Sequence, residues 1–330
     1  MANTGQRLFL LSIVLFAAIS RISSTSRRHQ PSMSVSRNQP QLQQRQPSTP
    51  SSSITDFAPS SPFNPNPRFG FISSNCHFQT IIGSGALHSK FFGPTTRRFE
   101  TRSERIDTPD GDFFDIEWTK GFEDADKIVL VTHGLESNTK GNLVTRFATA
   151  FQSKGFACCL VGFRSCSDEP NRTPGAYHLG FTADLMLLLT IIRERYPSKD
   201  IYLSGFSLGG NVVLKLLGEL GDKAKDMRIK GCAIACVPFD PVQSQIKLDV
   251  GFNRAVYSEN FLQTLKKKAE KQILLFPGAF DIEAIRACKT IGDFDEAYIA
   301  KIYGFANKVK NKLMAKYTLP NQQRSEEEYL

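Results

Sequence analysis

The chain has 330 residues, 41% of them hydrophobic, which is enough to bury one sizeable core behind a polar N-terminal stretch. Its formal net charge of +9 is unevenly distributed, because residues 1–75 contain seven arginines and a single acid and so carry +6 of it. The remainder is nearly balanced and has no basic stripe interleaved with aromatics, which argues against a nucleic-acid-binding protein.

The seven cysteines are odd in number and lack the paired spacing of a metal site, so we expect no disulfide framework and no bound metal. Cys232 and Cys236, at even spacing, should share one face of a strand as packing residues. Free thiols favour a reducing compartment. Four of the cysteines lie in apolar runs that predict buried strands: Cys158, Cys159, Cys232 and Cys236.

Residues 1–75 are predicted to be a targeting or disordered tail. The apolar run at 8–20 has 13 residues, fewer than the roughly 20 that a spanning helix needs, and with Arg7 before it resembles a secretory signal. Residues 21–67 are rich in Ser, Pro, Gln and Arg, which is typical of a transit peptide. We favour a chloroplast location. A signal-anchored membrane or secretory route and a plain disordered tail stay open.

The next segments alternate between strand-like and helix-like patterns. Residues 98–106 and 112–118 flank a turn at 108–111, which predicts a β-hairpin. Strands alternating with helices then predict an α/β protein with a mostly parallel, doubly wound sheet and reactive loops at the strand carboxyl ends. The expected strands are 127–134, 156–163, 201–206 and 229–239, and the expected helices are 143–153, 177–196 and 208–220.

After Asp240 the sequence becomes helical, polar and aromatic, which predicts a helical cap at about 240–305. The run at 273–276 is the last that reads as a strand. We expect the lysines at 266–268 to form a solvated helix face rather than a phosphate or membrane site. The predicted folded domain therefore spans 76–305, and a divergent polar tail spans 306–330.

A G-x-S-x-G motif lies between a predicted strand and a predicted helix. The motif alone is weak, because chance supplies it in about one chain of this length in ten. At a tight strand-to-helix turn, however, Gly205 and Gly209 would leave room for an exposed Ser207 hydroxyl, the arrangement of a nucleophile elbow. The Leu208 N–H, at the helix N-terminus, would face a developing oxyanion. A glycine-rich turn with an incidental serine is the alternative.

A second motif follows the first strand of the parallel series. His133 and Gly134 open a loop at the position from which hydrolases of this fold supply their other oxyanion donor, and the Leu135 N–H is the candidate. We expect His133 to shape this loop rather than to act as a base.

These motifs resemble the AB hydrolase 4 family, which includes the plant embryogenesis-associated hydrolases. The resemblance spans about 76–305 and rests on segments 133–135, 162–185, 205–211 and 293–298. It implies an α/β-hydrolase fold with Ser207 as nucleophile, Leu208 and Leu135 as oxyanion donors, and carboxylic esters as substrates: short- or medium-chain acyl esters, monoacylglycerols or phospholipids. His178 is similar to a structural position near the pocket.

The chain departs from this family after the nucleophile. The fold's triad acid and base follow the serine in sequence, yet no histidine follows Ser207; the five histidines are His29, His77, His88, His133 and His178. The sequence therefore indicates that the triad acid and base are absent, that the C-terminal strands are missing in a truncated product, and that strand 229–239 lies at an uncovered sheet edge.

The expected function is that of a serine esterase-family hydrolase, impaired because it lacks a base. Rescue by His133 or His178 stays open. The alternatives are a non-catalytic binding module of the same fold and a chain that does not fold stably. A small ester or lipid is the expected partner, with no cofactor and no nucleic acid. Peripheral membrane contact and the oligomeric state are left open.

Overall fold

The computed structural model describes residues 75–83 and 99–304. The predicted targeting tail, except Asn75, and the predicted polar tail lie outside these residues, so both stay predictions. Within the described part, no helix is both long and apolar enough to span a membrane. The apolar run at 8–20 lies outside that part.

The described strands form one six-stranded sheet in the order β1-β2-β4-β3-β5-β6. The antiparallel hairpin β1–β2 joins β4, and β4, β3, β5 and β6 run parallel to one another. The expected mostly parallel α/β sheet with an opening hairpin is confirmed. The strands are β1 (Thr101–Asp107), β2 (Phe113–Thr119), β3 (Lys127–Thr132), β4 (Ala157–Val161), β5 (Asp200–Phe206) and β6 (Ile229–Ala235).

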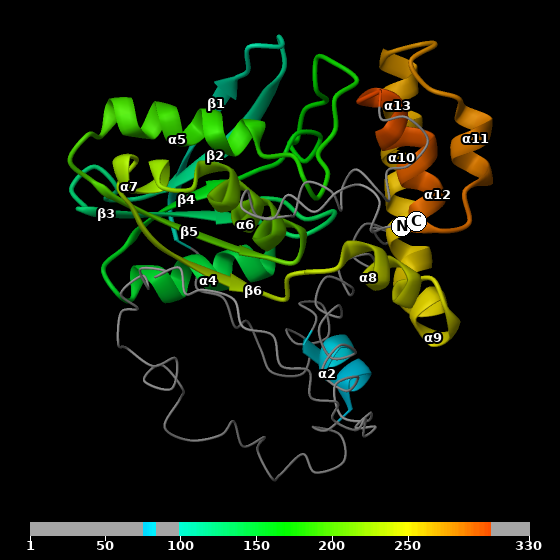
Figure 1. Cartoon of the computed structure of the whole chain (residues 1–330), viewed down its shortest axis with the longest axis horizontal. Coiled ribbons are helices and arrows are strands. Elements are labelled where there is room, and N and C mark those ends of the chain that lie inside the picture. Colours follow the sequence, from blue (N-terminus) through cyan, green and yellow to red (C-terminus); the bar gives the residue numbers. More distant parts are fainter. Residues whose placement is uncertain (1–74, 84–98, 305–330) are drawn as a thin grey trace, which may run out of the picture.

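Alternate side chains of the central strands point to opposite faces of the sheet, and each face is covered by helices (Figure 1). In β3, Ile128 and Leu130 join the core beneath α5 (Ala183–Arg195) and α6 (Leu208–Leu220). Val129 and Val131 join the core beneath α4 (Asn142–Gln152). Because both faces are buried, the strands are continuous apolar runs.

From Pro241 to Ile302 the chain is helical and forms the cap, which has its own core. Ala176, in the loop after β4, is part of this core, and Leu135, in the loop after β3, packs against it. The cap therefore packs on loops at the carboxyl ends of the strands. The remaining helices are α2 (Cys76–Gly83), α7 (Lys223–Asp226), α8 (Pro241–Leu248), α9 (Gly251–Asn253), η5 (Arg254–Ser258), α10 (Glu259–Leu275), α11 (Ile282–Ala287), α12 (Ile291–Phe294), η6 (Asp295–Ile299) and α13 (Ala300–Ile302).

Two predicted elements were wrong in type or extent. The run at 273–276 is no strand: Leu275 ends α10, and Leu274 is 81% exposed, so this apolar run is not buried. The helix expected over 177–196 begins only at Ala183, because residues 177–182 form a loop that contacts other elements. It ends before Pro197, as expected from the missing N–H of proline.

β6 is an edge strand among the described strands, as expected for the strand at 229–239; whether the edge is uncovered stays a prediction. Its position overturns one prediction about cysteines. Cys158 and Cys159 are fully buried in β4, but Cys232 is exposed and Cys236 lies just past the end of β6. An apolar run predicts a strand but does not reveal that one of its edges lacks a neighbour.

Candidate active site

Ser207 lies between the last residue of β5 and the first residue of α6. Its backbone has φ 53° and ψ −126°, a conformation that non-glycine residues rarely adopt and that costs about 1–3 kcal/mol. The Ser207 N–H donates to the Ala235 carbonyl (2.9 Å), and its own carbonyl accepts from Asn211 N (3.1 Å). These bonds to β6 and α6 hold the strained turn and leave the half-buried side chain outside both elements.

Neighbouring backbones pack so closely around this turn that only glycine fits at the flanking positions. A Cβ on Gly205 would stand 2.3 Å from Thr132 Oγ1, and one on Gly209 would stand 2.4 Å from the His133 carbonyl oxygen. Gly205 and Gly209 are therefore required because the elbow packs directly against the end of β3. The local geometry of the turn is only part of the reason that no larger residue fits.

The loop after β3 forms a tight turn directly beside Ser207. Ser137 N donates to the Gly134 carbonyl (3.2 Å), and Glu136 has φ 56°. A Cβ on Gly134 would stand 3.3 Å from Ser207 Cβ, so the two predicted motifs lie in contact. Within the described residues the Leu135 N–H makes no backbone hydrogen bond. Leu208 N–H, in the first turn of α6, has no intrahelical acceptor.

His133 is buried, and both of its ring nitrogens are engaged. Phe163 N donates to Nε2 (3.1 Å), so Nε2 carries no proton, and Nδ1–H donates to the Gly134 carbonyl (2.8 Å). Burial lowers the pKa of His133 to about 4. A neutral imidazole with both nitrogens bonded to backbone holds the turn in place and cannot accept a proton from Ser207.

His178 lies in the loop before α5. Its Nδ1 accepts from Gly180 N (3.1 Å), and its ring contacts Phe181 and Tyr303 edge-on. Across residues 75–83 and 99–304, no histidine is hydrogen-bonded to the Ser207 hydroxyl. The assembled site thus holds the predicted nucleophile and the two predicted backbone donors without a bonded base.

Sequence analysis missed a cluster of polar groups behind the turn. Glu136 Oε1 accepts from Tyr177 Oη (2.9 Å) and from Lys268 Nζ (2.7 Å), and Lys268 lies on α10. Lys266 Nζ donates to the Arg286 and Cys288 carbonyls, leaving Lys267 as the exposed member of the run. The prediction of a solvated lysine face is therefore wrong for Lys268, which is paired with Glu136.

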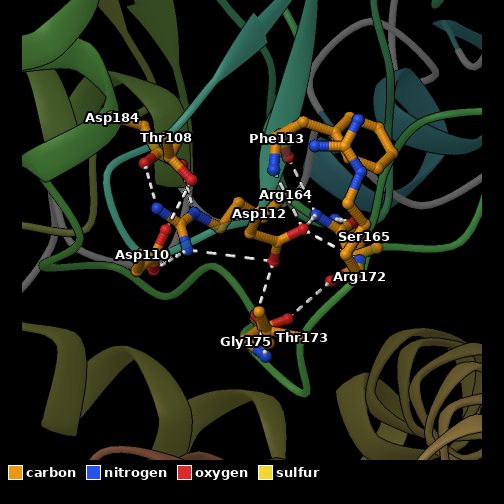
Figure 2. A network of polar contacts seen from close by, with 12 residues as sticks. Thr108, Asp110, Asp112, Phe113, Arg164, Ser165, Arg172, Thr173, Gly175 and Asp184 are labelled. Atoms are coloured by element: carbon orange, nitrogen blue, oxygen red, sulfur yellow. Dashed lines mark hydrogen bonds and ion pairs between the residues drawn. The ribbon is translucent and has the colours of Figure 1, made fainter.

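Sequence analysis also missed a second network of polar contacts, which joins the hairpin turn, the loop after β4 and α5 (Figure 2). Arg164, 4% exposed, lies just after β4 and makes a bidentate pair with Asp184 of α5 (2.7 Å for both bonds) and a bond to Asp110 in the hairpin turn (2.5 Å). Fully buried Asp112 accepts from Asn171 Nδ2, 2.7 Å away. The network fastens the hairpin, the loop after β4 and the start of α5 together.

No group of three or more His, Cys, Asp or Glu side chains gathers in metal-binding geometry within the described part of the chain.

The fold is that of an α/β hydrolase, and the family described as alpha/beta hydrolase fold matches residues 127–280. The chain is 30% identical over 258 residues to the putative esterase YheT of Escherichia coli, covering 77% of this chain and 72% of that protein. The chain belongs to the AB hydrolase family.

Two further relatives extend the comparison to eukaryotes. The embryogenesis-associated protein EMB8 of Picea glauca is 25% identical, over 73% of this chain and 53% of that protein. Phospholipase ABHD3 of Bos taurus is 25% identical, over 62% of this chain and 51% of that protein. The chain thus spans about half the length of these two relatives.

Proposed function

We propose that the protein acts on carboxylic esters through Ser207. Attack of Ser207 Oγ on the acyl carbon would form a tetrahedral oxyanion, which the Leu135 and Leu208 N–H groups would stabilise. The Ser207 hydroxyl proton would pass to solvent water. Collapse would break the ester C–O bond, and the leaving alcohol would take a proton from water. A further water would then hydrolyse the acyl-enzyme to the carboxylic acid and free Ser207. The observation that carries this proposal is the strained Ser207 turn packed against the Gly134 turn, because backbone strain of this kind clusters at functional sites.

The proposed substrates are short- or medium-chain acyl esters, monoacylglycerols or phospholipid-like esters. The support is that the named relatives include a putative esterase and a phospholipase.

We further propose that turnover by this chain is slow. In serine hydrolases, loss of the base costs on the order of a million-fold in kcat, while oxyanion stabilisation and binding retain about a thousand-fold over water. His133 is committed to backbone bonds, so it does not replace the base.

Hydrolysis of p-nitrophenyl butyrate by the full chain, beside Ser207→Ala, tests this proposal. We expect a weak rate above the buffer background that Ser207→Ala abolishes. A rate that Ser207→Ala leaves unchanged would refute Ser207 as the nucleophile. A rate typical of an efficient esterase would refute the impairment, and His178→Ala would then identify the base.

A non-catalytic binding module is the second candidate, favoured by the absence of a base bonded to Ser207 among the described residues. In that case a fluorescent fatty acyl ester would bind with equal affinity to wild type and to Ser207→Ala, and neither would release product. If neither wild type nor Ser207→Ala binds the ester, the binding-module function is refuted.

A chloroplast location is also proposed, on the composition of residues 1–75 alone. Import of the radiolabelled chain into isolated chloroplasts, with and without these residues, tests it. Insertion into microsomes instead would favour the secretory alternative.

A further inference from the structure

A buried ion pair links the turn beside Ser207 to the cap. The Glu136 side chain is 6% exposed, the Lys268 side chain is 26% exposed, and their oxygen and nitrogen lie 2.7 Å apart. They are 132 residues apart in sequence, so the pair joins two separate parts of the fold. Removing such charges from water costs several kcal/mol per ion, and an apolar pair of similar volume would often be as stable.

Tyr177 holds the same turn through a second pair of bonds. Its hydroxyl accepts from the Glu136 backbone N–H (2.7 Å) and donates to Glu136 Oε1 (2.9 Å). Its ring stacks on Phe163 with a centroid separation of 5.3 Å, and Lys268 Nζ lies 5.4 Å from the ring centroid. One tyrosine thus fixes both the backbone and the side chain of Glu136.

Glu136 is the charged partner that balances Lys268. Burial alone would lower the pKa of the Lys268 ammonium, but the ion pair and hydrogen bond with the Glu136 carboxylate oppose this, and the pKa is raised overall. The nearby Cys166 Sγ, 3.6 Å from Lys268 Nζ, has its own pKa raised to about 11, chiefly by burial, and so stays a neutral thiol at physiological pH. The lysine therefore remains charged.

These contacts converge on the residue after Leu135. Glu136 has a positive φ, which a non-glycine residue keeps only when its surroundings hold it there. The Leu135 side chain packs against both the core under α5 and α6 and the core of the cap. The orientation of the Leu135–Glu136 peptide is thus set jointly by the sheet loops and by α10.

We propose that Tyr177, Glu136 and Lys268 form a clamp of positioning residues that holds the Leu135 N–H toward the oxyanion of a substrate attacked by Ser207. The inference rests on the proposed function, and it adds that α10 controls the rate of the chemical step through this clamp. Because the three residues contact the Leu135–Glu136 turn, we expect the clamp to act on the chemical step more than on substrate binding.

Tyr177→Phe is the sharpest variant, because it deletes one hydroxyl and keeps the stacked ring. Tyr257→Phe is its matched control: Tyr257 is a fully buried cap tyrosine whose hydroxyl bonds His77 Nδ1 (2.9 Å). Lys268→Met leaves a buried carboxylate unpaired and risks misfolding, so Tyr177→Phe carries the test and Lys268→Arg, which keeps the charge, checks it. Lys267→Met is the exposed neighbouring control.

Two measurements on the full chain decide the proposal. The first is the rate of amide hydrogen exchange in residues 133–138. The second is the rate of labelling by a fluorophosphonate at several concentrations, which gives the maximal labelling rate and the half-saturating concentration separately. Tyr177→Phe should speed exchange in this segment at least about ten-fold. It should slow the maximal labelling rate roughly 10- to 100-fold with the half-saturating concentration unchanged. Lys268→Arg should retain most of the rate, and both controls should behave as wild type.

Unchanged exchange in Tyr177→Phe overturns the clamp. Faster exchange with an unchanged labelling rate overturns its role in positioning the donor. If the fluorophosphonate does not label wild type, the proposed function fails. Amide hydrogen exchange then decides by itself whether Tyr177, Glu136 and Lys268 hold the turn. Faster exchange confined to 133–138 then upholds the clamp, and exchange equal to that of Tyr257→Phe overturns it.

Discussion

The two edges of the sheet differ in how they meet solvent. β1 is polar or charged at every position except the buried Ile106, and its Arg105 pairs with Asp115 (2.8 Å) on β2. β6 has a single charged residue, Lys230, and its small and apolar side chains are partly or fully exposed, followed by Phe239 at 68% exposure. Charged residues on an edge strand oppose association with another strand, so within the described part of the chain β1 carries this protection and β6 does not.

The protected side of the sheet depends on Arg164, and its loss should give the largest effect. Arg164→Met leaves the Asp184, Asp110 and Asp112 carboxylates without their buried cation. Urea unfolding should show a loss of about 3–5 kcal/mol. Arg172→Met, which removes an exposed pair with Asp107, should change stability by less than about 1 kcal/mol. Similar losses in both variants would contradict the network's structural role.

His133, just past the end of the central strand β3, makes the free energy of unfolding depend on pH. Its pKa in the folded state is about 4, below the ordinary value of 6.5, so the unfolded chain takes up a proton first. The stability that depends on neutral His133 is complete above pH 6.5 and is lost as the pH falls toward 4. Between pH 7 and pH 4.5 this amounts to about 2 kcal/mol.

The test measures the unfolding free energy of wild type and of His133→Asn at about pH 7 and about pH 4.5. The change between the two pH values is compared, so a difference in stability at the higher pH does not affect the result. The variant should lose about 2 kcal/mol less than wild type on acidification. An identical loss in both proteins would mean that His133 does not titrate as the structure indicates.

The elbow beside β6 stores strain that glycine should relieve. Ser207→Gly should raise stability by about 1 kcal/mol, the balance between relief of the positive φ and the greater chain entropy of glycine. Ser207→Ala keeps the strain and should stay within about 0.5 kcal/mol of wild type. Thermal denaturation of the three proteins measures this. A destabilised glycine variant would show that the conformation is not strained.

The smallest effect on stability, and the most direct test of the edge comparison, comes from a lysine on each edge. Ala233→Lys on β6 should lower concentration-dependent light scattering, because a charge on an unprotected edge opposes strand pairing. Ser103→Lys on the exposed face of β1 should leave scattering unchanged. Unfolding free energies should shift by less than about 0.5 kcal/mol in both. Equal light scattering by both variants would refute the claim that the chain associates through the β6 edge.

The sequence predicted those features whose cause is local. Apolar runs gave the central strands, and Gly205 and Gly209 marked the elbow because a tight turn requires small residues there. Lys268 was misjudged because its partner is 132 residues away, and no pattern around a lysine run reveals that. Cys232 was misjudged because burial depends on whether a neighbouring strand is present. The helix expected from Tyr177 failed because the Tyr177 hydroxyl bonds Glu136 in a distant turn.

Fluorophosphonate labelling of the full chain, followed by peptide mapping and compared with Ser207→Ala, tests the central claim most directly. A serine held beside two backbone donors should react slowly but faster than any other serine of the chain, so we predict a single labelled peptide containing Ser207 that is absent from Ser207→Ala. Labelling that persists in Ser207→Ala, or no labelling of the folded wild-type protein, would contradict the assignment of this turn as a nucleophile elbow.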